Sequence, residues 1–135
     1  MSLQLEIVTP EARVYEDTVD SVVVPTTSGD IGILPGHIPL VTEVKDGEII
    51  VEKGGSSDSL AVSKGFAQVV GDKVSVLAEN AIQIEEIDEQ EVLAAQERAE
   101  KALENMQSMD KEEIEMLETT IRYARAQLIL KKRRR

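Results

Sequence analysis

The period of the hydrophobic pattern changes near residue 85, and this change constrains the fold of the chain more than any other feature. Before it, apolar residues alternate with polar ones, as Leu3, Leu5 and Ile7 do, or form short β-branched runs such as residues 22–24. After it, apolar residues recur at spacings of three and four, which is the period of an α-helix. The sequence therefore predicts two domains, a β domain over residues 1–84 and a helical domain over residues 88–135.

The predicted β domain consists of many short strands that are separated by turns rich in glycine. Strands at spacings of about 8–12 residues are typical of a β-sandwich or a flattened barrel. After the run at 22–24, the predicted strands are residues 31–34, 40–44, 48–51, 59–63, 66–70 and 74–77. The predicted core is aliphatic apart from one aromatic residue, and it consists of Leu5, Ile7, Val22, Val24, Ile33, Val41, Ile49, Val51, Leu60, Val62, Phe66, Val69, Val74 and Val76.

The helical domain carries two apolar stripes, each preceded by an acidic N-cap signal. Asp88 precedes Glu91 as in a capping box, and Asp110 begins a second signal of the same kind. The stripes are Val92, Ala95, Ala99, Ala102 and Met106, then Ile114, Leu117, Ile121, Ala124 and Leu128. They predict two helices of about 20 residues joined by a loop of about four. The expected fold class is therefore an N-terminal all-β sandwich or flattened barrel followed by a C-terminal antiparallel α-helical hairpin.

The first helix presents mostly alanine at the predicted seam of this hairpin. Alanine permits close approach but buries little apolar area, so the seam gains about half the stabilisation of a leucine-based one. A hairpin joined this weakly can exchange its folded arrangement for another that costs only a few kcal/mol more.

Composition excludes several classes of site. The chain has no cysteine and one histidine, so thiolate and histidine-rich metal sites are excluded and no metal or cofactor is expected. Three aromatic residues and a net charge of −11 argue against a nucleic-acid partner. No apolar run approaches the roughly 18 residues of a membrane span, and the N-terminus lacks a signal sequence. We expect a soluble protein of a reducing compartment, without direct membrane insertion.

Charge is distributed unevenly along the chain. Residues 1–84 carry 13 acidic and 5 basic side chains, and residues 85–118 carry 13 acidic and 3 basic ones. Residues 119–135 carry no acid and seven bases, which are Arg122, Arg125 and all of residues 131–135. An acidic helical region followed by a basic end favours recognition of a partner over ordinary charge segregation.

Residues 28–40 predict a rigid, exposed corner after a short strand. Pro35 and Pro39 restrict φ to about −65°, whereas Gly36 permits positive φ. The segment contains one histidine, His37, and no nucleophile, so it indicates a contact surface and not a catalytic site.

The order of this and several further motifs resembles the epsilon subunit of F-type ATP synthases of the bacterial type. The resemblance covers nearly the whole chain. It rests on Val8-Thr9-Pro10, Val14-Tyr15, residues 28–37, Gly65-Phe66-Ala67, residues 74–78, Ile87-Asp88 and residues 122–128.

The resemblance implies a non-catalytic subunit of the central stalk, peripheral on the cytoplasmic face of the bacterial plasma membrane. The implied partners are the gamma subunit, the alpha/beta catalytic hexamer and the membrane c-subunit ring. The β domain would couple these partners for ATP synthesis, and the hairpin would inhibit ATP hydrolysis. The implied rotor-ring or gamma contact is Asp30, Ile31, Leu34, Pro35, Gly36, His37, Ile38 and Pro39. The implied inhibitory contact is Arg122, Arg125, Lys131, Lys132 and Arg133.

The chain departs from the signature with which some bacterial relatives bind ATP on the hairpin. The matching positions are Ile87, Asp88, Glu91 and Arg98, so an acid stands at the position of the phosphate-facing arginine. Tyr123 and Gln127 also replace arginines. Because Glu91 would repel phosphate, this degenerate nucleotide site is expected to bind ATP weakly or not at all.

Alternative interpretations remain for single residues and for the whole chain. His37 also fits a purely structural corner residue, and Asp30 also fits a residue that stabilises its own turn. Arg122 and Arg125 share a helix face and could brace the acids of the first helix. The chain could alternatively be a helical-hairpin adaptor or chaperone-like protein. A small β-sandwich hydrolase is disfavoured, since no acid pair shows a context of burial.

Overall fold

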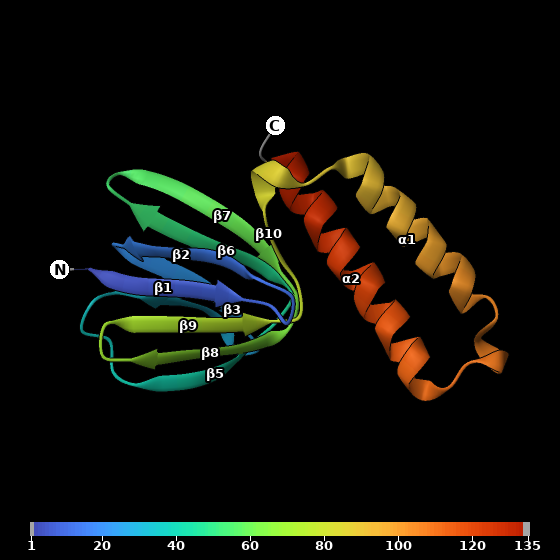
Figure 1. Ribbon diagram of the computed structural model, residues 1–135, viewed down its shortest axis with the longest axis horizontal. Coiled ribbons are helices and arrows are strands. Elements are labelled where there is room, and N and C mark those ends of the chain that lie inside the picture. Colours follow the sequence, from blue (N-terminus) through green and yellow to red (C-terminus); the bar gives the residue numbers. More distant parts are fainter. Residues whose placement is uncertain (1, 134–135) are drawn as a thin grey trace. The chain divides into compact units, whose positions relative to one another are not determined.

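The computed structural model describes residues 2–133, and the chain divides into two compact units, Met1–Gln83 and Ile84–Arg135 (Figure 1). The first unit contains strands and the second contains helices, so the change of hydrophobic period coincides with a change of structure.

In the described residues, the first unit folds into a ten-stranded sheet with the order β10-β7-β6-β3-β5-β8-β9-β1-β2, while β4 pairs with β3. Neighbouring strands are antiparallel except for β1 and β9, which are parallel. The strands are β1 Leu3–Val8, β2 Arg13–Val19, β3 Ser21–Thr26, β4 Gly29–Ile33, β5 Leu40–Val44, β6 Gly47–Lys53, β7 Ser56–Val62, β8 Gly65–Val70, β9 Lys73–Ala78 and β10 Ala81–Gln83.

The sheet folds over on itself into a sandwich that is nearly a closed barrel. β3 and β5 are paired only through Thr26 and Val44, so the two layers separate at this point. At the opposite edge, β2 contacts β6 without pairing with it. Figure 1 shows β5, β8, β9 and β1 side by side in one layer. The predicted fold class, a sandwich or flattened barrel followed by a helical hairpin, is confirmed.

The interior of the sandwich is aliphatic, as predicted, with two exceptions. Of the predicted core residues, all are buried except Val41 and Phe66, which are 69% and 55% exposed. Side chains alternate between the faces of a strand, and Ala67 and Val69 occupy the inward face of β8. Phe66 therefore points outward. The same alternation, set by the buried Val44, turns Val41 outward on β5.

Two strands were not predicted. In β2, only Val19 is buried, because this edge strand keeps most of its polar residues at the surface. β10 has three residues and is half-buried throughout, so it carries no apolar pattern long enough to detect.

The second unit begins with the 3₁₀ turn η1, Ile84–Glu86, which leads into helices α1, Glu89–Leu103, and α2, Lys111–Arg133. Both predicted caps are present. The Asp88 carboxylate accepts hydrogen bonds from the amides of Gln90 and Glu91, and the Asp110 carboxylate accepts one from the amide of Glu113.

The first helix is shorter, and the connection between the helices longer, than predicted. α1 has 15 residues and α2 has 23, and the connection contains the 3₁₀ turn η2, Met106–Ser108. α1 ends early because the amides of Glu104 and Asn105 bond to carbonyls three residues back, which tightens the last turn. Met106 consequently lies outside the seam and is 50% exposed.

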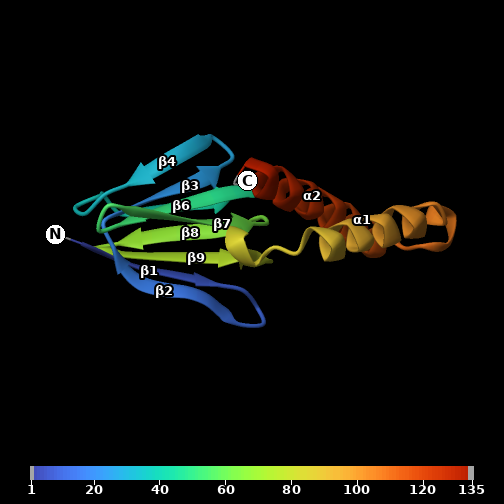
Figure 2. The same ribbon diagram turned by 90° about the horizontal axis from the view of Figure 1, so that it is seen from above.

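The hairpin seam is as thin as the alanine stripe predicted. α1 buries only Val92 and Ala99, and α1 and α2 contact each other as an antiparallel pair (Figure 1, Figure 2). α2 buries Ile121 and Ala124 as predicted, and it also buries Thr119, Gln127 and Leu130. Among residues 2–133, no helix is long and apolar enough to cross a membrane.

Candidate functional site

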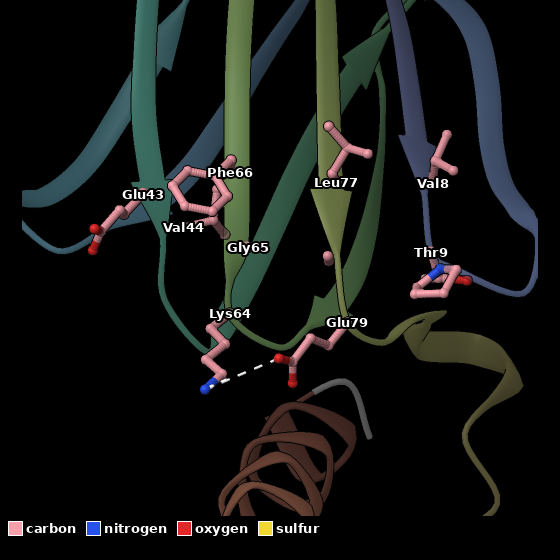
Figure 3. A pocket seen from close by; sticks show the side chains of 11 residues that line it. Val8, Thr9, Glu43, Val44, Lys64, Gly65, Phe66, Leu77 and Glu79 are labelled. Carbon is pink, nitrogen blue, oxygen red and sulfur yellow. Dashed lines mark ion pairs between the residues drawn. The ribbon is translucent and has the colours of Figure 1, made fainter. Parts of the chain in front are cut away.

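An apolar row crosses the outer face of the sandwich on three adjacent strands. The strand register aligns Phe66 on β8 with Leu77 on β9, and Leu77 with Val8 on β1. Phe66 and Leu77 are 55% and 56% exposed, and Val8 is half-buried. Figure 3 shows the three side chains on the same face. Val41 and Val70 add exposed apolar surface on β5 and β8.

This row borders an open groove of about 510 Å³. Glu43 stands at one side, and the Nζ atom of Lys64 lies 4.0 Å from the Oε1 atom of Glu79 at the end of the strands (Figure 3). The groove thus has apolar walls and a charged border, which is the composition of a surface that receives another protein.

Gly65 allows the strands beside the groove to approach closely. A Cβ atom at this position would lie 1.8 Å from the carbonyl oxygen of Leu77, so no other residue fits without displacing β9. The groove was not predicted, because the hydrophobic pattern placed Phe66 and Val41 in the core. The alternation around Val69 was the signal that could have corrected this assignment.

The predicted corner is exposed and anchored. Leu34 and Ile38 are 62% and 74% exposed, and Gly36 has a φ of 86°, which favours glycine. The Gly36 amide donates to the Asp72 carboxylate at 3.2 Å, which ties the corner to the β8–β9 turn. Within the corner, the His37 amide donates to the Leu34 carbonyl at 3.1 Å, and His37 Nδ1 lies 2.7 Å from the Ile38 carbonyl oxygen. Pro35 is half-buried and Pro39 is exposed.

The structure does not bring all residues of the predicted rotor or gamma contact together. Asp30 pairs with Pro25 near the β3–β4 turn, and Ile31 follows it, whereas the corner lies beyond the other end of β4. Leu34 is four positions after Asp30, which corresponds to about 13 Å of extended chain. The predicted contact therefore consists of two surfaces, an acidic one at Asp30 and an apolar one at Leu34 and Ile38.

The basic residues of α2 also fall into two groups. Arg122 and Arg125 are exposed, and the guanidinium of Arg122 donates to the Thr119 hydroxyl at 3.1 Å. Lys131 begins the second group about 9 Å beyond Arg125 along the helix. Lys132 and Arg133 are exposed, whereas Arg134 and Arg135 lie outside the described residues.

Two of the four positions of the degenerate nucleotide site have structural roles in the helical unit. Asp88 uses its carboxylate as the cap of α1, and Ile87 is buried. Glu91 and Arg98 are exposed on α1. The described residues contain no group of three or more His, Cys, Asp or Glu side chains that could hold a metal ion.

A charged cluster lies where β2 contacts β6. The ammonium of Lys53 and the amide of Thr18 hydrogen-bond to the Asp17 carboxylate and lower its pKa, while the bond to Asp17 raises the pKa of Lys53. Burial, and then the charges of Asp58 and Asp17, raise the pKa of the Tyr15 phenol. A lowered carboxyl pKa is opposite to that of a general acid, so this cluster is a structural one.

The amino-acid sequence of the sandwich matches a known protein family. Residues 2–84 match the family described as the beta-sandwich domain of the ATP synthase delta/epsilon chain. The ATP synthase epsilon chain of Halalkalibacterium halodurans is 46% identical over 103 residues, which cover 76% of this chain and 77% of that protein. The ATP synthase epsilon chain of Herpetosiphon aurantiacus is 40% identical over 135 residues, which cover 100% of this chain and 98% of that protein.

Solved structures are similar as well. A chain in the OSCP/F1/c-ring structure of the Euglena gracilis mitochondrial ATP synthase matches with a TM-score of 0.70 and 26% identity, over 93% of this chain and 78% of that chain. A chain of the Tetrahymena thermophila mitochondrial ATP synthase central stalk and c-ring matches over 97% of both chains, with a TM-score of 0.59. At 13% identity, the second match shows the fold alone.

Proposed function

Because this chain belongs to the ATP synthase delta/epsilon chain family, we propose that it is the epsilon subunit of an F-type ATP synthase and forms part of the central stalk. It acts there as a structural subunit and not as a catalytic one. Its similarity to bacterial relatives supports a position on the cytoplasmic face of a plasma membrane, where the other subunits hold it.

The exposed apolar row on the sandwich is the observation that supports a stalk contact best. We propose that Val8, Phe66 and Leu77 receive the gamma subunit. About half of the Phe66 and Leu77 side chains is still exposed, so their burial would contribute about 1 kcal/mol each. Gly65 and the Lys64–Glu79 pair limit this surface at one end and orient the partner.

The corner and Asp30 serve a second contact, with the ring of c subunits. Leu34 and Ile38 expose apolar side chains on a loop whose backbone is restrained by two prolines and by the bond from Gly36 to Asp72. A restrained loop transmits torque with little deformation. Asp30 adds a negative charge at the other end of β4.

The helical hairpin regulates hydrolysis. We propose that it opens, that Arg122 and Arg125 then meet acidic residues of the catalytic subunits, and that rotation in the direction of hydrolysis stops. The thin seam supports this proposal, because α1 has two buried residues, Val92 and Ala99, and their exposure on opening costs little free energy.

A fragment of residues 1–86 tests the division of roles. The sandwich has its own core, so the fragment is expected to fold and to restore proton-coupled ATP synthesis in complexes that lack the full chain. It should not inhibit hydrolysis. A folded fragment that fails to restore synthesis would contradict the assignment of the stalk contacts to the sandwich.

Serine substitutions test the gamma contact. Phe66→Ser and Leu77→Ser should each weaken binding to a gamma-containing hexamer by about fivefold. Ile38→Ser is the matched control, because Ile38 is 74% exposed on the sandwich and belongs to the proposed contact with the ring of c subunits, which this hexamer lacks. Equal affinities for all three variants would contradict the placement of gamma on this face.

A further inference from the structure

Lys131 is engaged within the helical unit. Its Nζ atom donates hydrogen bonds to the carbonyl oxygens of Ile84 and Glu85, both at 3.2 Å. These two carbonyls belong to η1, the turn from which the hairpin begins. The bonds therefore join the last turn of α2 to the first residues of the same unit, 46 and 47 positions earlier in the sequence.

The surroundings of Lys131 indicate that the end of α2 is seated and not frayed. α2 contacts η1 as well as α1. Gln127 and Leu130 are buried although neither belongs to the predicted seam, while the seam residue Leu128 is only half-buried. Ile84 and Ile87 are buried too. The buried face of α2 thus turns away from the α1 stripe over its last two turns.

The electrostatics of this position favour a cation. The carbonyls of a final helical turn lack partners and carry partial negative charge, and basic residues in the last turn are stabilised by it. Glu85 and Glu86 add formal negative charge on η1. The Ile84 carbonyl also accepts from the amide of Ile87 at 3.2 Å, so the turn keeps its shape while it binds the ammonium.

We infer that Lys131 is a latch that holds the C-terminal turn of α2 on η1 and that must release before the hairpin opens. This inference rests on the proposed regulatory role of the hairpin. It changes the role assigned to Lys131, because the ammonium cannot hold the η1 carbonyls and a carboxylate of the catalytic subunits in the same state. Lys131 stabilises the closed hairpin, whereas Arg122 and Arg125 are available to the partner in the open one.

Amide hydrogen exchange of the full-length chain tests the latch without other subunits. Lys131→Gln should accelerate exchange of the amides of residues 124–130 by about fivefold to tenfold, since two hydrogen bonds from a charged donor are lost. Lys132→Gln is the matched control, because it removes the same charge from the adjacent exposed position. Lys131→Arg should retain slow exchange, since a guanidinium can donate to both carbonyls.

Equal exchange rates in Lys131→Gln and Lys132→Gln would overturn the latch and leave the stalk assignment unaffected. Hydrolysis by reconstituted complexes separates the two proposals further. With the latch, Lys131→Gln inhibits hydrolysis more strongly than Lys132→Gln, because more of the chain is open at the same total charge. If exchange differs as expected but no form of the chain inhibits hydrolysis, the latch is supported and the inhibitory function is wrong.

Discussion

The Asp17 carboxylate on β2 lies 2.6 Å from the Lys53 ammonium on β6. These two strands form the edge at which the sheet is not closed by strand pairing. Two further bonds join Asp20, between β2 and β3, to the end of β6: the Gly54 amide donates to the Asp20 carboxylate at 2.8 Å, and the Asp20 amide donates to the Glu52 carbonyl at 2.8 Å. The ion pair between Asp17 and Lys53 thus joins two strands that are not paired through their backbones.

Asp17→Asn should lower the urea midpoint of unfolding at pH 7. The pKa of Asp17 is lowered in the folded state, so its stabilising effect is complete above the ordinary carboxyl pKa of 3.8 and is lost as the pH falls through the lower folded value. The pKa of Lys53 is raised, so its effect is complete below 10.5 and is lost at higher pH. The difference between variant and parent should therefore vanish once the pH falls below the lowered pKa of Asp17 in the folded state.

Glu16→Gln is the control for this titration. Glu16 pairs with Arg13 at 2.8 Å within β2, so this ion pair does not bridge β2 and β6. It should leave the urea midpoint at pH 7 almost unchanged. A gap between Asp17→Asn and the parent that persists at low pH would show that the ion pair is not its cause.

Gly65→Ala should lower the free energy of unfolding by about 3 kcal/mol, because the added methyl group overlaps the Leu77 carbonyl. Gly32→Ala is the matched control on β4, since nothing lies within 4 Å of the position that its methyl group would take and its φ is not positive. We expect the control to change stability by less than about 1 kcal/mol. Urea unfolding of both variants measures the difference, and similar losses would contradict a steric cause.

Replacing Arg122 and Arg125 together with alanine should relieve inhibition of hydrolysis by about fivefold, while synthesis is largely retained. Exposed ion pairs contribute about 0–1 kcal/mol each, and two lost pairs account for an effect of this size. Added salt should reproduce part of the relief in the parent, since screening acts over about 8 Å at physiological ionic strength. If the double variant inhibits as well as the parent at low and high salt, the apolar residues of α2 must carry the contact.

Calorimetric titration with ATP should detect no binding at low micromolar concentrations. Glu91 presents a negative charge to phosphate, and Asp88 is already engaged with the amides of Gln90 and Glu91. Glu91→Arg should increase the affinity. A micromolar dissociation constant for the parent would show that other side chains compensate.

Features that depend on neighbouring residues could be predicted from the amino-acid sequence. The alternation around Leu5 and Ile7 predicted a half-buried strand, and Asp88 and Asp110 marked the starts of both helices. These signals are local because a cap or a strand face is defined within a few positions of the chain. The alanine stripe likewise predicted a thin seam.

The tertiary structure alone decided what depends on residues far apart in the sequence. Phe66 is exposed because the register of β8 with β5 and β9 directs Ala67 and Val69 inward, and no single strand reveals which of its faces will be covered. Lys131 finds its carbonyls 46 and 47 positions earlier, and Lys53 finds Asp17 36 positions earlier. Such pairs form only when packing brings distant segments together. A local sequence pattern does not show which distant residues will come into contact.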